Sequence, residues 1–213
     1  MFPYFSRYST WMFILMLFFD MPFAAAQEEW SLDKNSGSIE VYTRSVPGSN
    51  IKEVRATTEI DAAPEKVFAV LLDSDKFVEF MPYIVEVRTV ARDSADIWYL
   101  YQRISPPLAS ERDYTLRHQK IVDTQHGYYE LKWEAANSHG PAARNGVVRV
   151  NTCTGAYILD SLGNGTRTRL TYQLHTDPEG SLPKWIVNFA NSTSVPALLQ
   201  AIANRVANPS YHR

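Results

Sequence analysis

The side chains best suited to chemistry in this 213-residue sequence are its five histidines and its single cysteine. The histidines are scattered along the chain, at His118, His126, His139, His175 and His212. They form no HExxH zinc motif, and the sequence contains neither a GxSxG nucleophile elbow nor a glycine-rich phosphate loop. The pattern therefore predicts no catalytic residue and no cofactor, and it indicates a protein that is not an enzyme.

Cys153 offers one chemical alternative, because with His118 it would supply a nucleophile and a base. A cysteine in an apolar strand is, however, typical of an inert core residue. A single cysteine also excludes an internal disulfide and a CxxC redox or zinc site. We therefore interpret Cys153 as part of a wall or core, and we predict no metal site.

The N-terminus has the order of a secretory signal peptide. Arg7 precedes an apolar run at residues 11–19, and Ala24-Ala25-Ala26 provides small residues for cleavage. We predict a signal peptide at residues 1–26 and an exported, periplasmic mature chain at residues 27–213. The alternative is an uncleaved anchor in the inner membrane. Asp20 interrupts the apolar run at about half the ~20 residues that a spanning helix needs, which favours cleavage.

The remaining chain is long enough for one domain with a substantial core. Its formal net charge of −2 provides no basic footprint for a polyanion, so we predict no nucleic-acid partner. The sequence identifies no protein partner.

Most of the predicted secondary structure that would position the histidines and the cysteine consists of strands. Helical patterns begin at Pro64 and cover residues 75–81 and 182–207. Strand patterns lie at 39–44, 51–60, 83–91, 95–105, 112–123, 128–136, 146–159 and 166–177, with turn signals between them. Because no βαβ alternation occurs, we predict an α+β fold with an antiparallel meander.

The predicted closing helix carries two apolar stripes on different faces. Leu182, Trp185, Ile186 and Phe189 form the first, and Val195, Leu198, Ile202 and Val206 form the second. Pro196 lies where the stripe changes, so a kink there would re-aim the second half. The helix is either an ordinary amphipathic cover for a sheet or a jointed lid over a cavity.

Segments in the same order along the mature chain resemble motifs of the START (StAR-related lipid transfer) family. They are Trp30-x-Leu32 with Ile39-x-Val41-Tyr42-x-Arg44, Asp73-Ser74-Asp75, Pro106 to Arg112-Asp113-Tyr114, Gly146-Val147-Val148-Arg149-Val150, Leu182-Pro183-Lys184-Trp185 and Val195-Pro196-x-Leu198-Leu199. The resemblance implies a helix-grip fold, in which a curved antiparallel sheet wraps around a long C-terminal helix and encloses an apolar cavity. Residues 27–213 would then form a START-like lipid-binding domain.

The resemblance also implies which side chains contact the lipid. The expected ligand-binding residues are Tyr99, Tyr101, Arg103, Leu116, His118, Leu131, Trp133, Cys153, Tyr157, Tyr172, Trp185 and Phe189. The expected gate is the loop at residues 105–111 with Pro106, Pro107 and Leu108, together with the closing helix around Pro196. Whether Arg103 faces the cavity or solvent is left open. Arg112 and Asp113 are expected to form a structural pair at the base of the lid.

Departures from the family narrow the expected ligand. Phe77 stands where phosphatidylcholine-binding members use an arginine for the phosphate, and the aromatic cage for choline is incomplete. We therefore expect a single hydrophobic lipid (a sterol or hopanoid, a fatty acid or a phospholipid) that is transferred through transient contact with a membrane surface. The alternatives are a small-molecule enzyme of the polyketide cyclase or aromatase type and a non-catalytic envelope interaction module.

Overall fold

A single curved antiparallel sheet forms most of the protein. The computed structural model describes residues 29–180 and 193–211. The strands of the sheet lie in the order β1-β2-β3-β10-β9-β7-β6-β5-β4, and a short β8 pairs in parallel with β6. They are β1 (Ser31–Ser36), β2 (Ile39–Arg44), β3 (Glu53–Ile60), β4 (Ile84–Arg92), β5 (Ile97–Ile104), β6 (Arg112–Asp123), β7 (Tyr128–Ala135), β8 (Val148–Arg149), β9 (Thr152–Leu162) and β10 (Arg167–Asp177).

Alternating burial shows why these segments form a one-sided sheet. In β2 the side chains of Ile39, Val41 and Thr43 are buried, and the residues between them are more exposed. Such period-two burial is what a strand with one packed face requires. β4 to β7, β9 and β10 pair successively as a meander, and β3 joins the far side of β10.

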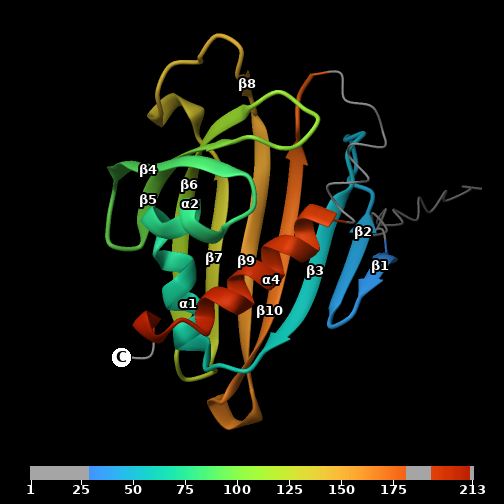
Figure 1. Ribbon diagram of the computed structural model, residues 1–213, viewed down its shortest axis with the longest axis vertical. Helices are drawn as coiled ribbons and strands as arrows, with labels where there is room; N and C mark the ends of the chain where they lie inside the picture. Colours follow the sequence, from blue (N-terminus) through green and yellow to red (C-terminus); the bar gives the residue numbers. More distant parts are fainter. Residues whose placement is uncertain (1–28, 181–192, 212–213) are drawn as a thin grey trace, which may run out of the picture.

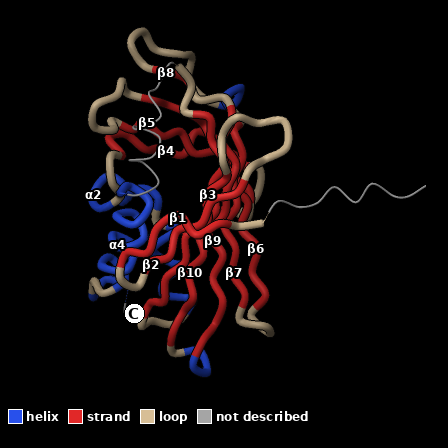
Figure 2. The backbone as a smooth tube through the Cα atoms, turned by 90° about the vertical axis from the view of Figure 1, so that its right-hand side faces the viewer, coloured by secondary structure: helices blue, strands red, loops and turns tan. Residues whose placement is uncertain are grey.

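The helices lie on the packed side of the sheet. α1 (Pro64–Leu72) begins with a proline, whose missing N–H needs no partner at that position, and it buries Val67, Phe68, Val70 and Leu71. A 3₁₀ turn (Ser74–Lys76) leads into α2 (Phe77–Phe80). α4 (Val195–Val206) runs obliquely across the sheet in front of β9, β10 and β3 (Figure 1). Figure 2 shows the helices together on one side of the strands. Shorter 3₁₀ turns occur at Asn137–His139, Gly163–Gly165 and Pro209–Tyr211.

α4 holds the sheet by one apolar stripe. Val195, Leu199, Ile202 and Val206 are buried at helical spacing, whereas Leu198 is only partly buried. Pro196 is the second residue of α4, which directly follows two residues in π-helical conformation at positions 193 and 194, so it lies in the first turn of this helix. The predicted first stripe, with Trp185 and Phe189, lies outside the described residues.

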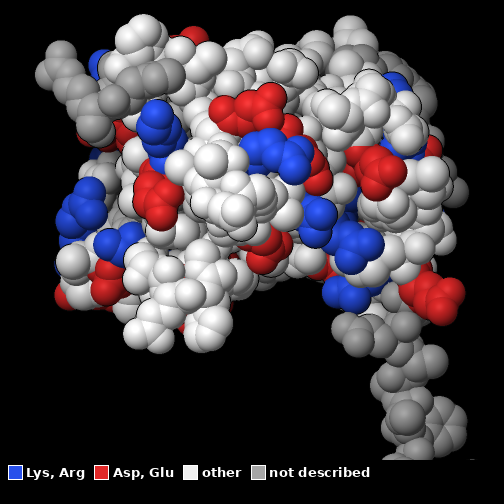
Figure 3. Space-filling model, turned by 90° about the horizontal axis from the view of Figure 1, so that it is seen from below, with Lys and Arg blue, Asp and Glu red and all other residues white. Residues whose placement is uncertain are grey.

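The structure confirms the α+β prediction and most strand positions. It adds β1, which the sequence reading did not identify, and it divides the predicted strand 146–159 into β8 and β9. In Figure 3, basic and acidic side chains lie side by side, so that face carries no field of one sign. None of the helices in residues 29–180 and 193–211 has the length and apolar composition to cross a bilayer.

Candidate ligand-binding cavity

A cavity of about 710 Å³ lies between the sheet, α2, the loop before β6 and the beginning of α4. Its volume falls in the upper part of the ~300–1,000 Å³ range typical of small-molecule sites. Most of its lining is apolar. The wall-forming side chains include Val54, Phe77, Met81, Ile84, Gln102, Ile104, Arg112, Tyr114, Leu116, His118, Leu131, Trp133, Val150, Cys153, Tyr157, Tyr172, Leu174 and Leu198.

Four central strands supply the wall in the alternation expected from the sequence. Seven of the predicted ligand-binding residues line the cavity: Leu116, His118, Leu131, Trp133, Cys153, Tyr157 and Tyr172. The rings of Trp133, Tyr157 and Tyr172 pack against one another, with centroids 5.0–6.0 Å apart. A Cβ on Gly155 would lie 2.5 Å from the Trp133 ring, so the glycine makes room for the indole over β9.

The predicted inward side of β5 is wrong. In the β5–β6 register, Trp98 pairs with His118, Leu100 with Leu116 and Gln102 with Tyr114. Directly paired residues share one face of a sheet, so the even-numbered residues of β5 face the cavity side. Gln102 and Ile104 line the cavity, and the predicted Tyr99, Tyr101 and Arg103 lie on the opposite face.

Tyr99 and Tyr101 instead belong to polar contacts on the outer face of β5. The Tyr99 hydroxyl donates to Asp93 at 2.9 Å, and its ring stacks on His139. The Tyr101 hydroxyl donates to Asp113 at 3.0 Å, and Asp113 is completely buried. Arg149 donates to both oxygens of the Asp113 carboxylate, at 2.6 and 3.1 Å. We call Tyr101, Asp113 and Arg149 the buried ion-pair cluster.

Arg103 forms its ion pairs outside the cavity. Its guanidinium pairs with Glu86 at 3.1 Å and with Glu111, and Arg144 binds the same Glu86 carboxylate. This answers the open question about its direction: Arg103 is not available to a ligand in the cavity.

Arg112 is the cationic side chain that the sequence reading placed wrongly. Its expected partner, Asp113, binds Arg149 instead, and Arg112 lines the cavity. It is only 5% exposed, and it donates from Nε to the Pro178 carbonyl at 3.1 Å and from Nη1 to the Ser110 carbonyl. Burial lowers the pKa of this guanidinium. Alternation from Tyr114 and Leu116 on β6 was the signal that could have found it.

His118 is a neutral polar group in the wall. Its imidazole stacks on Trp98 at 5.5 Å and lies 6.1 Å from Trp133, and burial lowers its pKa to about 4. Within the described residues, its Nδ1 has no hydrogen-bond partner. A neutral imidazole offers one donor and one acceptor, so His118 can bind a ligand hydroxyl or carbonyl but not act as a cation near pH 7.

Stability is expected to fall in acid because of His118. Its folded pKa of about 4 lies below its ordinary value of 6.5, so the unfolded chain gains the proton first as the pH decreases. The neutral His118 therefore contributes fully to the free energy of unfolding above pH 6.5. Between pH 6.5 and pH 4 this contribution falls by about 3 kcal/mol. Urea unfolding at both pH values checks this. His118→Phe should lose about 3 kcal/mol less than the wild type over the same interval, and an equal loss would contradict the assignment.

Cys153 and Tyr157, two further polar groups of the wall, are also uncharged. Burial raises the pKa of the Cys153 thiol to about 11 and that of the Tyr157 phenol well above its usual range. A protonated thiol is a poor nucleophile. The cavity can therefore bind apolar chains and a few polar atoms, and it lacks the thiolate that the Cys153–His118 alternative requires.

Of the predicted gate residues, Pro106 lines the cavity and the others lie beside it. Pro106 and Ala109 line it, Pro107 is exposed beside them, and Leu108 is 74% exposed with a φ of 65°. A leucine rarely adopts this left-handed backbone, which aims its apolar side chain into solvent. Pro196 is buried in the first turn of α4, next to Val195 in the cavity wall.

A curved sheet that grips a helix and encloses an apolar cavity defines the helix-grip class of ligand-binding proteins. The chain belongs to the START domain family, whose model matches residues 16–209. It is 30% identical to an uncharacterized protein of Pseudomonas aeruginosa over 77% of this chain and 80% of that protein. It is 25% identical to the phosphatidylcholine transfer protein of Mus musculus, over 87% of this chain and 86% of that protein.

Solved structures agree with this assignment. A STAR-related lipid transfer protein fragment from Xanthomonas axonopodis is 28% identical with a TM-score of 0.74, covering 84% of this chain and 99% of that chain. The Zhui aromatase/cyclase from Streptomyces is 14% identical with a TM-score of 0.52, covering 76% of this chain and 96% of that chain. The second likeness concerns the fold alone.

Proposed function

We propose that this protein binds one hydrophobic lipid in the cavity and transfers it between membranes. The cavity itself carries the proposal, because about 710 Å³ of largely apolar space inside a folded domain is suited to an apolar ligand. Membership of the START family and the likeness to named lipid transfer proteins support it. A sterol or hopanoid, a fatty acid and a phospholipid are the candidate ligands.

Selectivity for choline is not part of the proposal. A quaternary amine needs several ring faces around an open space. Trp133, Tyr157 and Tyr172 instead pack against one another at 5.0–6.0 Å between centroids. Their arrangement supports an apolar wall rather than a cage, despite the similarity to a phosphatidylcholine transfer protein.

Two alternatives receive less support. An enzyme on the same fold would need a group that reacts, but the Cys153 thiol is protonated and the His118 imidazole is neutral in this wall. An interaction module with a collapsed core is not compatible with the cavity volume. We therefore propose a carrier without catalytic residues.

The gate of the proposed carrier is the loop at residues 105–111 together with α4, whose first turn contains Pro196. The loop connects the cavity strands β5 and β6, and both it and Val195 line the mouth. Leu108 would insert into a membrane surface as the lipid passes. One leucine side chain contributes about 1.5–3 kcal/mol when buried, so the contact is weak and reversible, as a shuttle requires.

Replacing Leu108 by aspartate is expected to lower lipid transfer between vesicles about tenfold, because the apolar tip no longer enters the membrane surface. Lipid binding in solution should stay unchanged, since Leu108 is exposed and does not line the cavity. A fluorescent-lipid transfer assay with a parallel binding titration measures both.

The matched control is Val122→Asp, which places the same charge on another exposed apolar residue, at the other end of β6. Its transfer rate should equal that of the wild type. If Leu108→Asp transfers lipid as fast as this control, the loop is not the membrane contact.

We also propose that the protein acts in the periplasm after removal of residues 1–26. The order of Arg7, the apolar run and Ala24-Ala25-Ala26 supports this location. N-terminal sequencing of protein from the cell envelope should identify Gln27 as the first residue. An intact Met1 in the membrane pellet would support the inner-membrane anchor instead.

A further inference from the structure

The charges that face the cavity are all of one sign. Arg112 lines its interior, and the exposed Lys52 lies at its rim. Among the described lining residues there is no aspartate and no glutamate. The cavity therefore combines an apolar wall with positive charge that no acidic wall residue offsets.

Arg112 differs from the other well-buried arginines in its partners. The side chains of Arg44, Arg103, Arg149 and Arg205 are only 16–24% exposed, and each lies within 3.0 Å of a carboxylate oxygen. Within the described residues, Arg112 pairs with no carboxylate and binds only two backbone carbonyls. A guanidinium has five N–H donors, so three of them have no partner in the described part of the chain. A buried charge without a counter-charge is costly, and an anion from a ligand would offset that cost.

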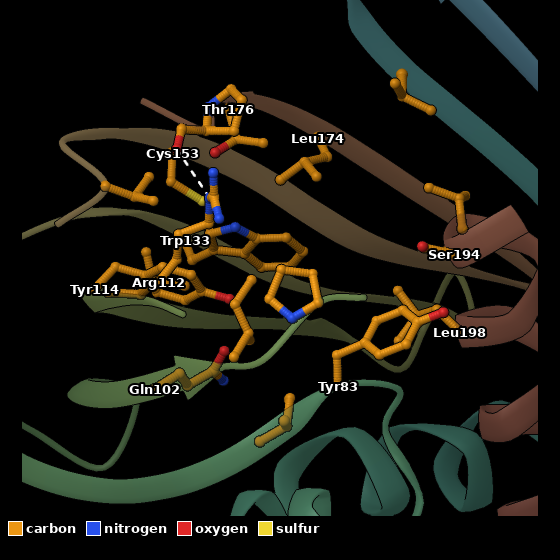
Figure 4. Close-up of a pocket in the computed structure, with 18 of the residues that line it drawn as sticks. Tyr83, Gln102, Arg112, Tyr114, Trp133, Cys153, Leu174, Thr176, Ser194 and Leu198 are labelled. Carbon is orange, nitrogen blue, oxygen red and sulfur yellow. Dashed lines mark hydrogen bonds between the residues drawn. The ribbon is translucent and has the colours of Figure 1, made fainter. Parts of the chain in front are cut away.

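Three tyrosines of the cavity wall add hydrogen-bond donors and no negative charge. Tyr114, Tyr157 and Tyr172 all line the cavity, and no hydrogen bond to their hydroxyls occurs in the described part of the chain. Their protonated phenols can each donate, because burial raises the pKa of all three. Figure 4 shows Arg112 and Tyr114 on the same side of the cavity as Cys153 and Thr176, opposite Ser194 and Leu198.

We propose that the bound lipid carries an anionic group, a carboxylate or a phosphate, that binds the Arg112 guanidinium while its apolar part extends towards α4. This inference rests on the proposed lipid-binding function and specifies its ligand class. Guanidinium binds carboxylate and phosphate oxygens with paired N–H donors, which a sterol hydroxyl cannot match. A neutral lipid of equal length fills the same apolar space but leaves Arg112 without a counter-charge.

The test compares lipids that differ only in charge. Palmitic acid is paired with palmityl alcohol, and phosphatidic acid with diacylglycerol of the same chains, each in competition for a bound fluorescent fatty acid. We expect the wild-type protein to prefer the anionic member of at least one pair by about tenfold or more, since a hydrogen bond to a charged group is involved. The pair that shows the preference distinguishes a carboxylate ligand from a phosphate ligand.

Variants assign the preference to Arg112. Arg112→Gln should reduce the ratio of anionic to neutral lipid affinity to about one, and Arg112→Lys should retain part of the preference. Arg103→Gln removes a comparable arginine outside the cavity and should leave it unchanged. Because the ratio is measured within each variant, partial unfolding of Arg112→Gln does not alter it.

Equal binding of charged and neutral lipids by the wild type would overturn the anionic ligand and leave the carrier function intact. A preference that survives in Arg112→Gln would also overturn it. Binding of no lipid in any arm would contradict the proposed function itself.

Discussion

A tryptophan in place of Leu174 is expected to lower lipid affinity about a hundredfold in a protein that remains folded. Leu174 projects into the cavity from β10 and is only partly buried (Figure 4). The larger indole would occupy empty space and exclude about three or four methylene groups of a bound chain, at about 0.8 kcal/mol each. Because it fills a void rather than a packed core, the cost of overpacking should be small.

The control for this variant is Thr171→Trp on the same strand. Thr171 has the opposite parity to Leu174 in β10 and does not line the cavity. A fluorescent-lipid titration should give wild-type affinity for the control, and circular dichroism should show that both variants are folded. Wild-type affinity in Leu174→Trp would show that lipid does not occupy this cavity.

Removing Asp113 is expected to lower the free energy of unfolding by about 3–5 kcal/mol. Its carboxylate is completely buried in the buried ion-pair cluster and accepts hydrogen bonds from Tyr101 and from two nitrogens of Arg149. Asp113→Ala leaves the Arg149 guanidinium, 16% exposed, without its counter-charge, which is the costly way to break such a pair. Urea unfolding measures the loss.

Two comparisons make this result specific to the cluster. Glu134→Ala breaks a more exposed pair with Arg117 and should cost less than about 1 kcal/mol. Adding Arg149→Met to Asp113→Ala should restore part of the lost stability, because no charge is then left unpaired. A double variant as unstable as the sum of the two single variants would contradict the role of charge.

Sequence patterns predict most of the sheet because its central strands carry one buried and one more exposed face. The resemblance to the START family, applied to this alternation, implies the cavity side of β6, β7, β9 and β10 correctly, as the lining by Leu116, Leu131, Cys153 and Tyr172 shows. A period-two pattern with one solvent face leaves a single choice of inward side.

β5 lacks this information. Residues 98–102 are all buried, because the segment around His139, Arg144 and Arg149 covers the outer face of the strand. A strand that is buried on both faces has no alternation of polar and apolar residues, so its sequence does not show which face points to the cavity. The correct side follows only from its pairing with β6, which is a property of the folded sheet.

Alternation along β6 could have placed Arg112 in the cavity, but no sequence pattern could have identified the partner of Asp113. Arg112 and Asp113 are adjacent in sequence, and neighbouring residues of a strand point to opposite faces. Asp113 therefore meets Arg149 from β8 across the outer face, while Arg112 enters the cavity. The parallel contact between β6 and the two-residue β8 decides this arrangement, and no local sequence pattern indicates such a short pairing.

Native mass spectrometry of the full chain, expressed with its own N-terminus and purified from the cell envelope, tests the central claim most directly. The account predicts one lipid-sized mass adduct per protein chain, which is released on denaturation and identified by fragmentation. It predicts the loss of this adduct in Leu174→Trp and its retention in Thr171→Trp. A wild-type spectrum that shows only the bare chain, before and after incubation with fatty acid, phospholipid and sterol vesicles, would contradict it.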